Sequence, residues 1–245
     1  MRILRSLLWR ILAFTPYELI RRENKPFLPE GNIEPIRIAL AYYLASRSDV
    51  IFVQIGACDG VSEDPVHDFV KRGKMRAVLV EPIESSFVKL KHTYEKISNV
   101  SCVHAAIGEE NGEKSFFVVR EGAASFDPYW SPQLASFSKA HLVKHGVPLG
   151  DINEVKVPVL TLETLFTKYK LEKIDILQID TEGFDGEIVR MALDLPHIPE
   201  CINFEHVHLN DVERTELFKL LSERGFGWAH DQSNTIALNQ TFGQR

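Results

Sequence analysis

The chain has 245 residues, 44% of them hydrophobic and 10% aromatic, and a formal net charge of −6. This length suits one large α/β domain and leaves too little chain for a second full domain. Because 34 acidic residues outnumber 28 basic ones, the charge excludes general attraction to nucleic acid, and no nucleic-acid partner is expected. Cys58, Cys102 and Cys201 lack metal-site spacing, and their odd number argues against a disulfide framework, so a cytoplasmic location is expected.

The first 22 residues differ from the rest because arginines accompany one apolar helical stripe. The arginines are Arg2, Arg5, Arg10, Arg21 and Arg22, and the stripe consists of Ile3, Leu4, Leu7, Leu8, Ile11 and Leu12. The stripe is too short for a transmembrane helix and lacks the features of a signal peptide. Two interpretations stay open: peripheral membrane contact, or packing on the chain's own domain or on a second subunit of a homo-oligomer. The pattern divides the chain into a segment and linker at 1–32 and a domain at 33–245.

The central feature of the domain is a strand pattern followed by a glycine turn, in residues 50–60, which read VIFVQIGACDG. The near-continuous apolar run predicts a parallel strand that helices cover on both faces. Gly56 and Gly60 allow a sharp turn and the close approach of a nucleoside ligand, and Asp59 offers a carboxylate. The run lacks the GxGxxG spacing that seats a pyrophosphate, whereas an acid suits the cationic methionine end of S-adenosylmethionine. The alternative is that Asp59 caps the following turn.

The next two strand patterns also end in residues suited to an adenosine ligand. The second strand ends in Glu81 and Pro82. A carboxylate in this place commonly accepts hydrogen bonds from the two ribose hydroxyls, although a solvated strand end is the alternative. The third strand ends in His104, Ala105 and Ala106, where residues of adenosine-binding folds usually contact the base. The alternative for His104 is an ordinary polar residue that closes the strand.

The alternation of strand and helix patterns predicts an α/β, Rossmann-like fold with a mostly parallel doubly wound sheet. The last two strand patterns, at residues 226–229 and 235–238, predict an antiparallel C-terminal hairpin. Asn111 and Gly112 predict the turn of a further hairpin that leads into residues 115–119.

An aromatic insertion without strand alternation occupies about residues 120–150. A helix is expected within it at residues 132–145. Because long insertions of this kind often form lids over a site, the specificity for the acceptor is expected here.

A second group of polar residues follows two later strand patterns. Asp180 and Glu182 end one strand, and Glu205, His206 and His208 end the next. Since the carboxyl ends of parallel strands share one edge of a sheet, these side chains are expected to converge with the glycine turn. Three carboxylates on separate strand ends have no diagnostic spacing for a divalent ion, so no metal is assigned.

Together these segments resemble the FkbM-type S-adenosylmethionine-dependent methyltransferases over roughly residues 50–208. The similar stretches read QIGACDGVS, VEP, HAAIGEENG, LTLETL, LQIDTEG and NFEH. The resemblance implies a class I methyltransferase fold of seven strands with S-adenosyl-L-methionine as cofactor. It also implies that Gly56, Asp59 and Glu81 lie at the cofactor and that Asp180 lies where donor and acceptor meet.

The chain departs from the family pattern at two positions: Gln178 stands where the family often has lysine, and Asp185 where it often has glutamate. These departures leave open what both side chains do in the acceptor site. Family members are associated with O-methylation of sugars, polyketides and other natural products, so a small-molecule or glycan acceptor is expected.

The implied reaction is an in-line displacement in which an acceptor oxygen attacks the donor methyl group. A general base contributes about 10²- to 10⁴-fold to such a reaction. Asp180 is the first candidate and His206 the second, with Glu182 and His208 also in reach of the same edge. Two rivals remain: an NAD(P)-binding oxidoreductase, which would need the missing GxGxxG, and a non-catalytic scaffold of the same fold.

Overall fold

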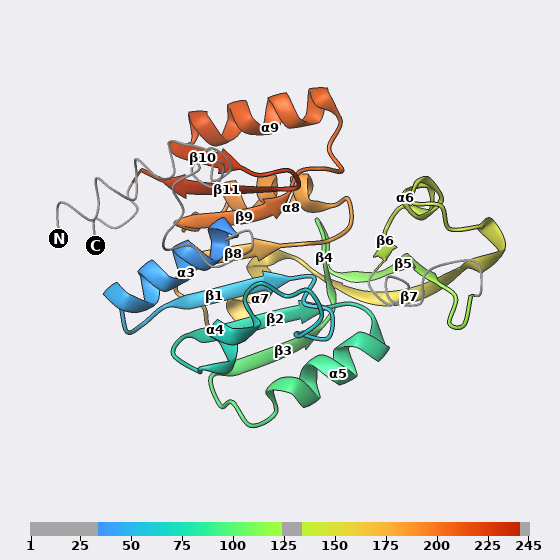
Figure 1. Cartoon of the computed structure of the whole chain (residues 1–245), viewed down its shortest axis with the longest axis horizontal. Coiled ribbons are helices and arrows are strands. Elements are labelled where there is room, and N and C mark those ends of the chain that lie inside the picture. The colour runs from blue at the N-terminus through green and yellow to red at the C-terminus, as the bar shows by residue number, and fades with distance from the viewer. Residues whose placement is uncertain (1–33, 124–133, 241–245) are drawn as a thin grey trace, which may run out of the picture.

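The computed structural model describes residues 34–123 and 134–240, which Figure 1 shows as a coloured ribbon. The basic segment at residues 1–22 and its linker lie outside these ranges, so its two interpretations stay predictions. Within the described ranges, no helix combines the length and the apolar composition that crossing a membrane requires.

The main sheet has seven strands in the order β10-β11-β9-β8-β1-β2-β3. Strands β9, β8, β1, β2 and β3 run parallel to one another. Strand β11 runs antiparallel to both of its neighbours, β9 and β10. Their bounds are β1 (Ile51–Ile55), β2 (Arg76–Glu81), β3 (Val100–His104), β8 (Ile176–Ile179), β9 (Cys201–Glu205), β10 (Phe226–His230) and β11 (Asn234–Asn239). This order confirms the predicted mostly parallel sheet and its antiparallel C-terminal hairpin.

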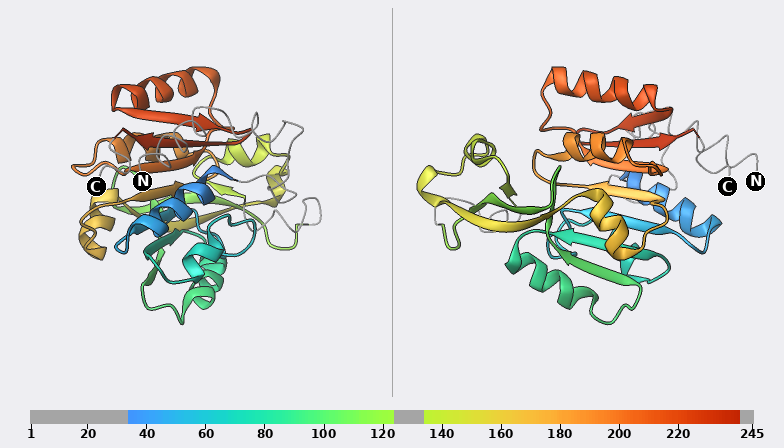
Figure 2. Two further views of the ribbon diagram at one scale, coloured as in Figure 1. Left: turned by 60° about the vertical axis from the view of Figure 1, so that its left-hand side comes forward. Right: turned by 180° about the vertical axis from the view of Figure 1, so that it is seen from behind.

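Helices cover both faces of the main sheet (Figures 1 and 2). Every residue of β1 is buried, because neighbouring side chains enter different cores: Phe52 packs in one and Val53 in the other. The core around Phe52 includes α3 (Pro35–Ser46), α4 (His67–Lys71) and α5 (Glu84–Tyr94), and the core around Val53 includes α7 (Leu162–Tyr169), α8 (Asp185–Leu193) and α9 (Asp211–Glu223). The sheet is therefore doubly wound, as predicted.

A second, smaller sheet projects beyond the carboxyl ends of the parallel strands (Figure 2). Its order is β4-β7-β5-β6, with bounds β4 (Ala106–Ile107), β5 (Gly112–Val119), β6 (Ala135–Ser136) and β7 (Ile152–Leu160). The prediction of a hairpin turn at Asn111 and Gly112 is wrong. The strands on either side of this turn, β4 and β5, do not pair with each other, because each pairs with β7. The later strand β7 thus separates the two strands that a local turn would have joined.

The aromatic insertion expected at about residues 120–150 belongs to this small sheet. Besides β6 it contains α6 (Lys139–Lys144) and a 3₁₀ turn, η1 (Leu149–Asp151). The expected helix is shorter than predicted because it begins after Ser138, whose hydroxyl accepts the N–H of His141 as an N-cap. Residues 124–133, which include Phe126, Tyr129 and Trp130 of the aromatic insertion, lie outside the described ranges.

Candidate active site

The turn after β1 depends on glycine at position 56. Gly56 has φ +82°, and a Cβ there would lie 1.7 Å from the backbone oxygen of Asp180. No side chain fits, because the turns after β1 and β8 come into direct contact at this point. Position 60 also requires glycine, because there is no space for a side chain: a Cβ there would lie 2.6 Å from the ring of Tyr94 and 2.7 Å from Leu90. Gly60 therefore packs against α5, and it lines neither of the two cavities described below.

Asp59 caps its own turn. Its Oδ1 accepts the N–H groups of Val61 at 2.9 Å and Ser62 at 2.8 Å, and its Oδ2 accepts the Ser62 hydroxyl at 2.7 Å. Although burial opposes ionisation, the hydrogen bonds from Ser62 and Val61 outweigh it and hold the pKa of Asp59 below its usual range. The capping alternative thus describes what the carboxylate does in this structure.

Glu81 is the anchored carboxylate of the site. The residue is only 5% exposed. Oε2 accepts the N–H of Cys58 and Oε1 accepts the N–H of Ile83, both at 2.8 Å. Burial raises the pKa of Glu81 to about 7 even though these two hydrogen bonds lower it. The end of β2 therefore presents a carboxylate in one set position, tied to the glycine turn after β1.

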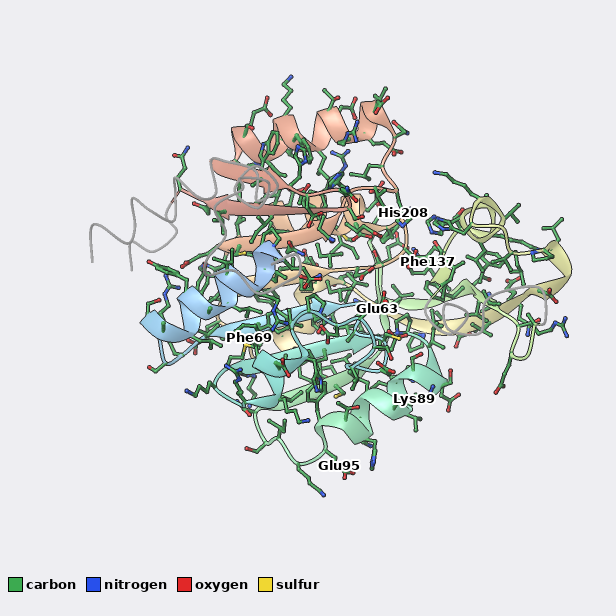
Figure 3. All side chains as sticks on the ribbon, viewed as in Figure 1. Glu63, Phe69, Lys89, Glu95, Phe137 and His208 are labelled. Atoms are coloured by element: carbon green, nitrogen blue, oxygen red, sulfur yellow. The ribbon has the colours of Figure 1, made fainter. Side chains whose placement is uncertain are left out.

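Two cavities meet at these strand ends. The first, here called the apolar cavity, is lined by Ile55, Gly56, Glu81, Pro82, Ile83, Ala105, Ala106, Ile107, Phe116, Ala135, Phe137, Asp180, Thr181, Glu182, Phe184 and Ile188. The predicted residues Pro82, Ala105 and Ala106 therefore come together with Glu81. Phe116 and Phe137 bring the small sheet into the wall, and Figure 3 labels Phe137 where the two sheets meet.

The second cavity, here called the acidic cavity, shares Gly56, Glu81, Ile83, Asp180 and Glu182 with the first. Its carboxylates come from Glu34, Glu63, Asp64, Glu81, Asp180, Glu182, Glu205 and Asp231. Among its described lining residues there is no lysine or arginine. This cavity therefore favours a cation over an anion.

A row of amides crosses the floor of the acidic cavity. Gln54, Gln178 and Asn203 occupy matching register positions on three adjacent strands. Asn203 Nδ2 donates to Gln178 Oε1 at 2.9 Å. The amide oxygens of Gln54 and Asn203 are buried and have no hydrogen-bond partner in the described part of the chain. Since buried carbonyls are normally paired, these two oxygens are exceptions, and both residues line the acidic cavity.

Asp180 lies at the junction of the two cavities. Its backbone N–H donates to the carbonyl of Ile55 at 2.9 Å, which ties the end of β8 to the end of β1. Asp180 is accessible to solvent, yet surrounding protein atoms remove enough water from its carboxylate to raise its pKa. The negative charges of Asp185, Glu205 and Glu182 raise this pKa further. The predicted convergence of Gly56, Glu81 and Asp180 is what the structure shows.

Asp185, where the family often has glutamate, organises the turn after β8. Its Oδ2 accepts the hydroxyl of Thr181 at 2.8 Å, and its Oδ1 accepts the N–H of Glu205 at 3.1 Å. Asp185 is buried and lines neither cavity. It holds the ends of β8 and β9 together instead of reaching either cavity.

His206 points away from the cavities. Its Nδ1 lies 3.0 Å from the hydroxyl of Thr235, and its ring packs beside those of Phe218 and His230. The side chain is buried and lines neither cavity. These contacts are those of a satisfied polar residue, and the structure does not bring His206 to Asp180.

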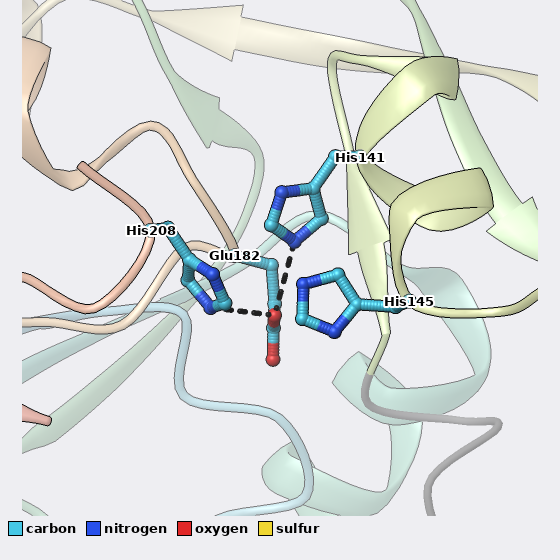
Figure 4. Close-up of side chains that lie close together, drawn as sticks. All are labelled: His141, His145, Glu182 and His208. Atoms are coloured by element: carbon cyan, nitrogen blue, oxygen red, sulfur yellow. Dashed lines mark hydrogen bonds and ion pairs between the residues drawn. The ribbon is translucent and has the colours of Figure 1, made fainter. Parts of the chain in front are cut away.

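His208 instead joins a group that the sequence analysis did not assemble (Figure 4). This histidine cluster consists of His141, His145, Glu182 and His208, whose nearest side-chain N and O atoms all lie within 4.8 Å of one another. Hydrogen bonds to Glu182 and Glu205 raise the pKa of His208 to about 10. The signal missed in the sequence was the spacing His-x₃-His at positions 141 and 145, which puts two imidazoles on one side of a helical turn.

The chain also matches a known domain family. The Methyltransferase FkbM domain matches residues 54–227, a range that contains Gly56, Glu81 and Asp180. No curated protein matches the chain.

Several solved structures are similar to the chain. The methyltransferase FkbM of Methylobacillus flagellatus KT is 15% identical with a TM-score of 0.48, and the match covers 78% of this chain and 44% of that one. Precorrin-6y C5,15-methyltransferase of Geobacter metallireducens GS-15 is 13% identical with a TM-score of 0.41, covering 89% and 96%. Aeropyrum pernix fibrillarin in complex with natively bound S-adenosyl-L-methionine is 10% identical with a TM-score of 0.39, covering 82% and 74%. The chain thus spans less than half the length of the Methylobacillus protein.

Proposed function

This chain belongs to the FkbM methyltransferase domain family, and from that premise we propose that it is an O-methyltransferase. Its donor is S-adenosyl-L-methionine, and its acceptor is a hydroxyl group of a sugar, glycan or other natural product. The single observation that carries the proposal is Glu81, a buried carboxylate held by two backbone N–H groups at the junction of an apolar and an acidic cavity.

The residues present fit this cofactor in three ways. Glu81 offers hydrogen-bond acceptors for two ribose hydroxyls. The apolar cavity beside it, with Pro82, Ala105 and Ala106 in its wall, suits a purine base. The acidic cavity on the other side, with the unpaired amide oxygens of Gln54 and Asn203, suits an ammonium and a sulfonium group. When bound, S-adenosyl-L-methionine supplies an electrophilic methyl group on sulfur.

Asp180 is the residue we assign to the acceptor. It lines both cavities, so a hydroxyl in the acidic cavity and the donor beside Glu81 are within its reach together. Its carboxylate accepts the hydroxyl hydrogen, which orients the oxygen and increases its nucleophilicity. Glu182 lines the same two cavities and is the alternative base, whereas the contacts of His206 with Thr235 and Phe218 argue against His206.

The test is a mass measurement over a panel of sugar, glycan and polyketide hydroxyl acceptors, to which amine and thiol acceptors are added. With labelled S-adenosyl-L-methionine, we expect one product to gain the mass of one methyl group and the label. Binding of NAD(P)H in place of S-adenosyl-L-methionine would overturn the proposal in favour of an oxidoreductase. Donor binding without transfer to any hydroxyl, amine or thiol of the panel would favour a scaffold, and transfer to nitrogen or sulfur would overturn the oxygen assignment.

A further inference from the structure

The histidine cluster lies where the small sheet meets the main sheet. His141 and His145 come from α6 and its C-cap, Glu182 from the loop after β8, and His208 from the loop after β9. Figure 4 shows the three imidazoles around the carboxylate of Glu182, and Figure 3 labels His208 near the same junction. We propose that the histidine cluster binds a divalent transition-metal ion.

The distances within the cluster suit a shared ion. The Nε2 atoms of His141 and His208 each lie 3.4 Å from the same oxygen, Oε2 of Glu182. Two ligand atoms at the usual bond lengths from a tetrahedral zinc ion are separated by about 3.3–3.4 Å. His145 completes the group, because its ring centroid lies 4.4 Å from that of His141 and 5.0 Å from that of His208.

The backbone around Glu182 is shaped for this arrangement. Glu182 has φ +52°, a left-handed conformation that is costly for a residue with a Cβ. Gly183 follows with φ +97°, and a Cβ at Gly183 would lie 2.8 Å from Nδ1 of His141. The hydroxyl of Ser136 donates to the carbonyl of Glu182 at 2.9 Å, so the small sheet holds the strained turn directly. A strained residue whose carboxylate contacts two imidazoles, with a third beside them, supports a functional role for this turn.

Glu205 is the neighbouring oxygen donor. Its Oε2 lies 2.9 Å from Nε2 of His208, so it is placed either to join the ion as a further ligand or to accept a hydrogen bond from metal-bound water. In both cases the ion would connect α6 to two loops of the main sheet.

The ligand set also indicates the class of ion. Three imidazole nitrogens and one carboxylate suit zinc, iron, cobalt or nickel, whereas magnesium and calcium prefer ligand sets made of oxygen. The proposal does not require methyl transfer. Only one consequence rests on the proposed function. Glu182 lines both cavities together with Asp180, so an ion bound to Glu182 would lie beside the acceptor hydroxyl and would lower the pKa of that hydroxyl.

The test uses the full-length protein, freed of metal with EDTA and titrated with Co²⁺ under a visible spectrometer. We expect d–d bands that saturate at one equivalent and are displaced by Zn²⁺ but not by Mg²⁺. His145→Ala and His208→Ala should each weaken Co²⁺ and Zn²⁺ binding at least about 100-fold. Even the loss of a residue that only hydrogen-bonds to a metal ligand lowers metal affinity about 10- to 100-fold. Because His145 is exposed, its replacement leaves the core unchanged.

The matched control is His92→Ala. His92 is an 82% exposed histidine that also pairs with a glutamate, Glu95, but it lies outside the cluster, so its variant should bind metal like the wild type. Unchanged binding in both cluster variants, or saturation by Mg²⁺ alone, would overturn the proposal. Binding of S-adenosylhomocysteine is measured in parallel. A chain that binds metal but methylates nothing refutes the proposed function alone, and one that methylates hydroxyls without binding metal refutes the metal site alone.

Discussion

Replacing Glu81 by glutamine tests the cofactor assignment most directly. Glutamine has the size of glutamate but no charge, and its amide can accept only through one oxygen. In the protein both oxygens of Glu81 accept backbone N–H groups, from Cys58 and Ile83. Hydrogen bonds to charged groups contribute about 1.5–3 kcal/mol, so S-adenosylhomocysteine should bind Glu81→Gln about 10- to 150-fold more weakly. Isothermal titration calorimetry measures this change.

The same substitution should alter how stability depends on pH. The pKa of Glu81 is about 7 in the folded chain and close to 4.5 when unfolded. A raised pKa means that the folded state holds the proton more tightly, so the contribution of Glu81 is present in full below pH 4.5 and is lost as pH rises towards 7. The shift corresponds to about 3 kcal/mol. Urea denaturation at several pH values should show this loss in the wild type and not in Glu81→Gln.

Cofactor affinity should have the opposite pH trend. An ionised carboxylate accepts the ribose hydroxyls better than a protonated one, so wild-type affinity for S-adenosylhomocysteine should rise between pH 6 and 8 while that of Glu81→Gln stays flat. Equal affinities and equal pH slopes in the two folded proteins would refute the ribose assignment of Glu81.

Three further predictions concern other parts of the site and chain. Asp180→Asn should lower turnover at least about 100-fold while S-adenosylhomocysteine still binds; near-normal turnover would move the search for a base to Glu182. Gly56→Ala should unfold the turn after β1 or abolish cofactor binding, because its Cβ would lie 1.7 Å from a backbone oxygen, whereas Gly122→Ala, with φ +71° but open space, should cost only about 1–2 kcal/mol in a denaturant titration. Deleting residues 1–22 should leave cofactor affinity unchanged, and if the full chain ignores anionic vesicles at low salt in flotation, the membrane interpretation of that segment is wrong.

The amino-acid sequence by itself determined the main sheet and the ends of its central strands. Buried parallel strands produce continuous apolar runs, and the residues that follow them meet at one edge by topology alone. Gly56, Glu81 and Asp180 could therefore be predicted to converge without knowledge of any side-chain contact. The C-terminal hairpin was equally local, because two short strands close together in sequence pair with each other.

The sequence could not decide which polar groups near a strand end face the cavities. His206 and His208 both follow β9, yet His206 packs against Thr235 and Phe218 while His208 reaches Glu182. Asp59 likewise had two possible roles, and the N–H groups of Val61 and Ser62 occupy its carboxylate. A choice of this kind depends on side-chain directions and on partners distant in sequence.

Only the tertiary structure assembled the histidine cluster and the small sheet. Strand β7 pairs with both β4 and β5, a non-local arrangement that no turn signal encodes. That sheet carries α6 back to the loops after β8 and β9, where His141 and His145 meet Glu182 and His208. The physical reason is that local patterns record which residues are buried, whereas the contacts between distant segments follow from how their surfaces pack together.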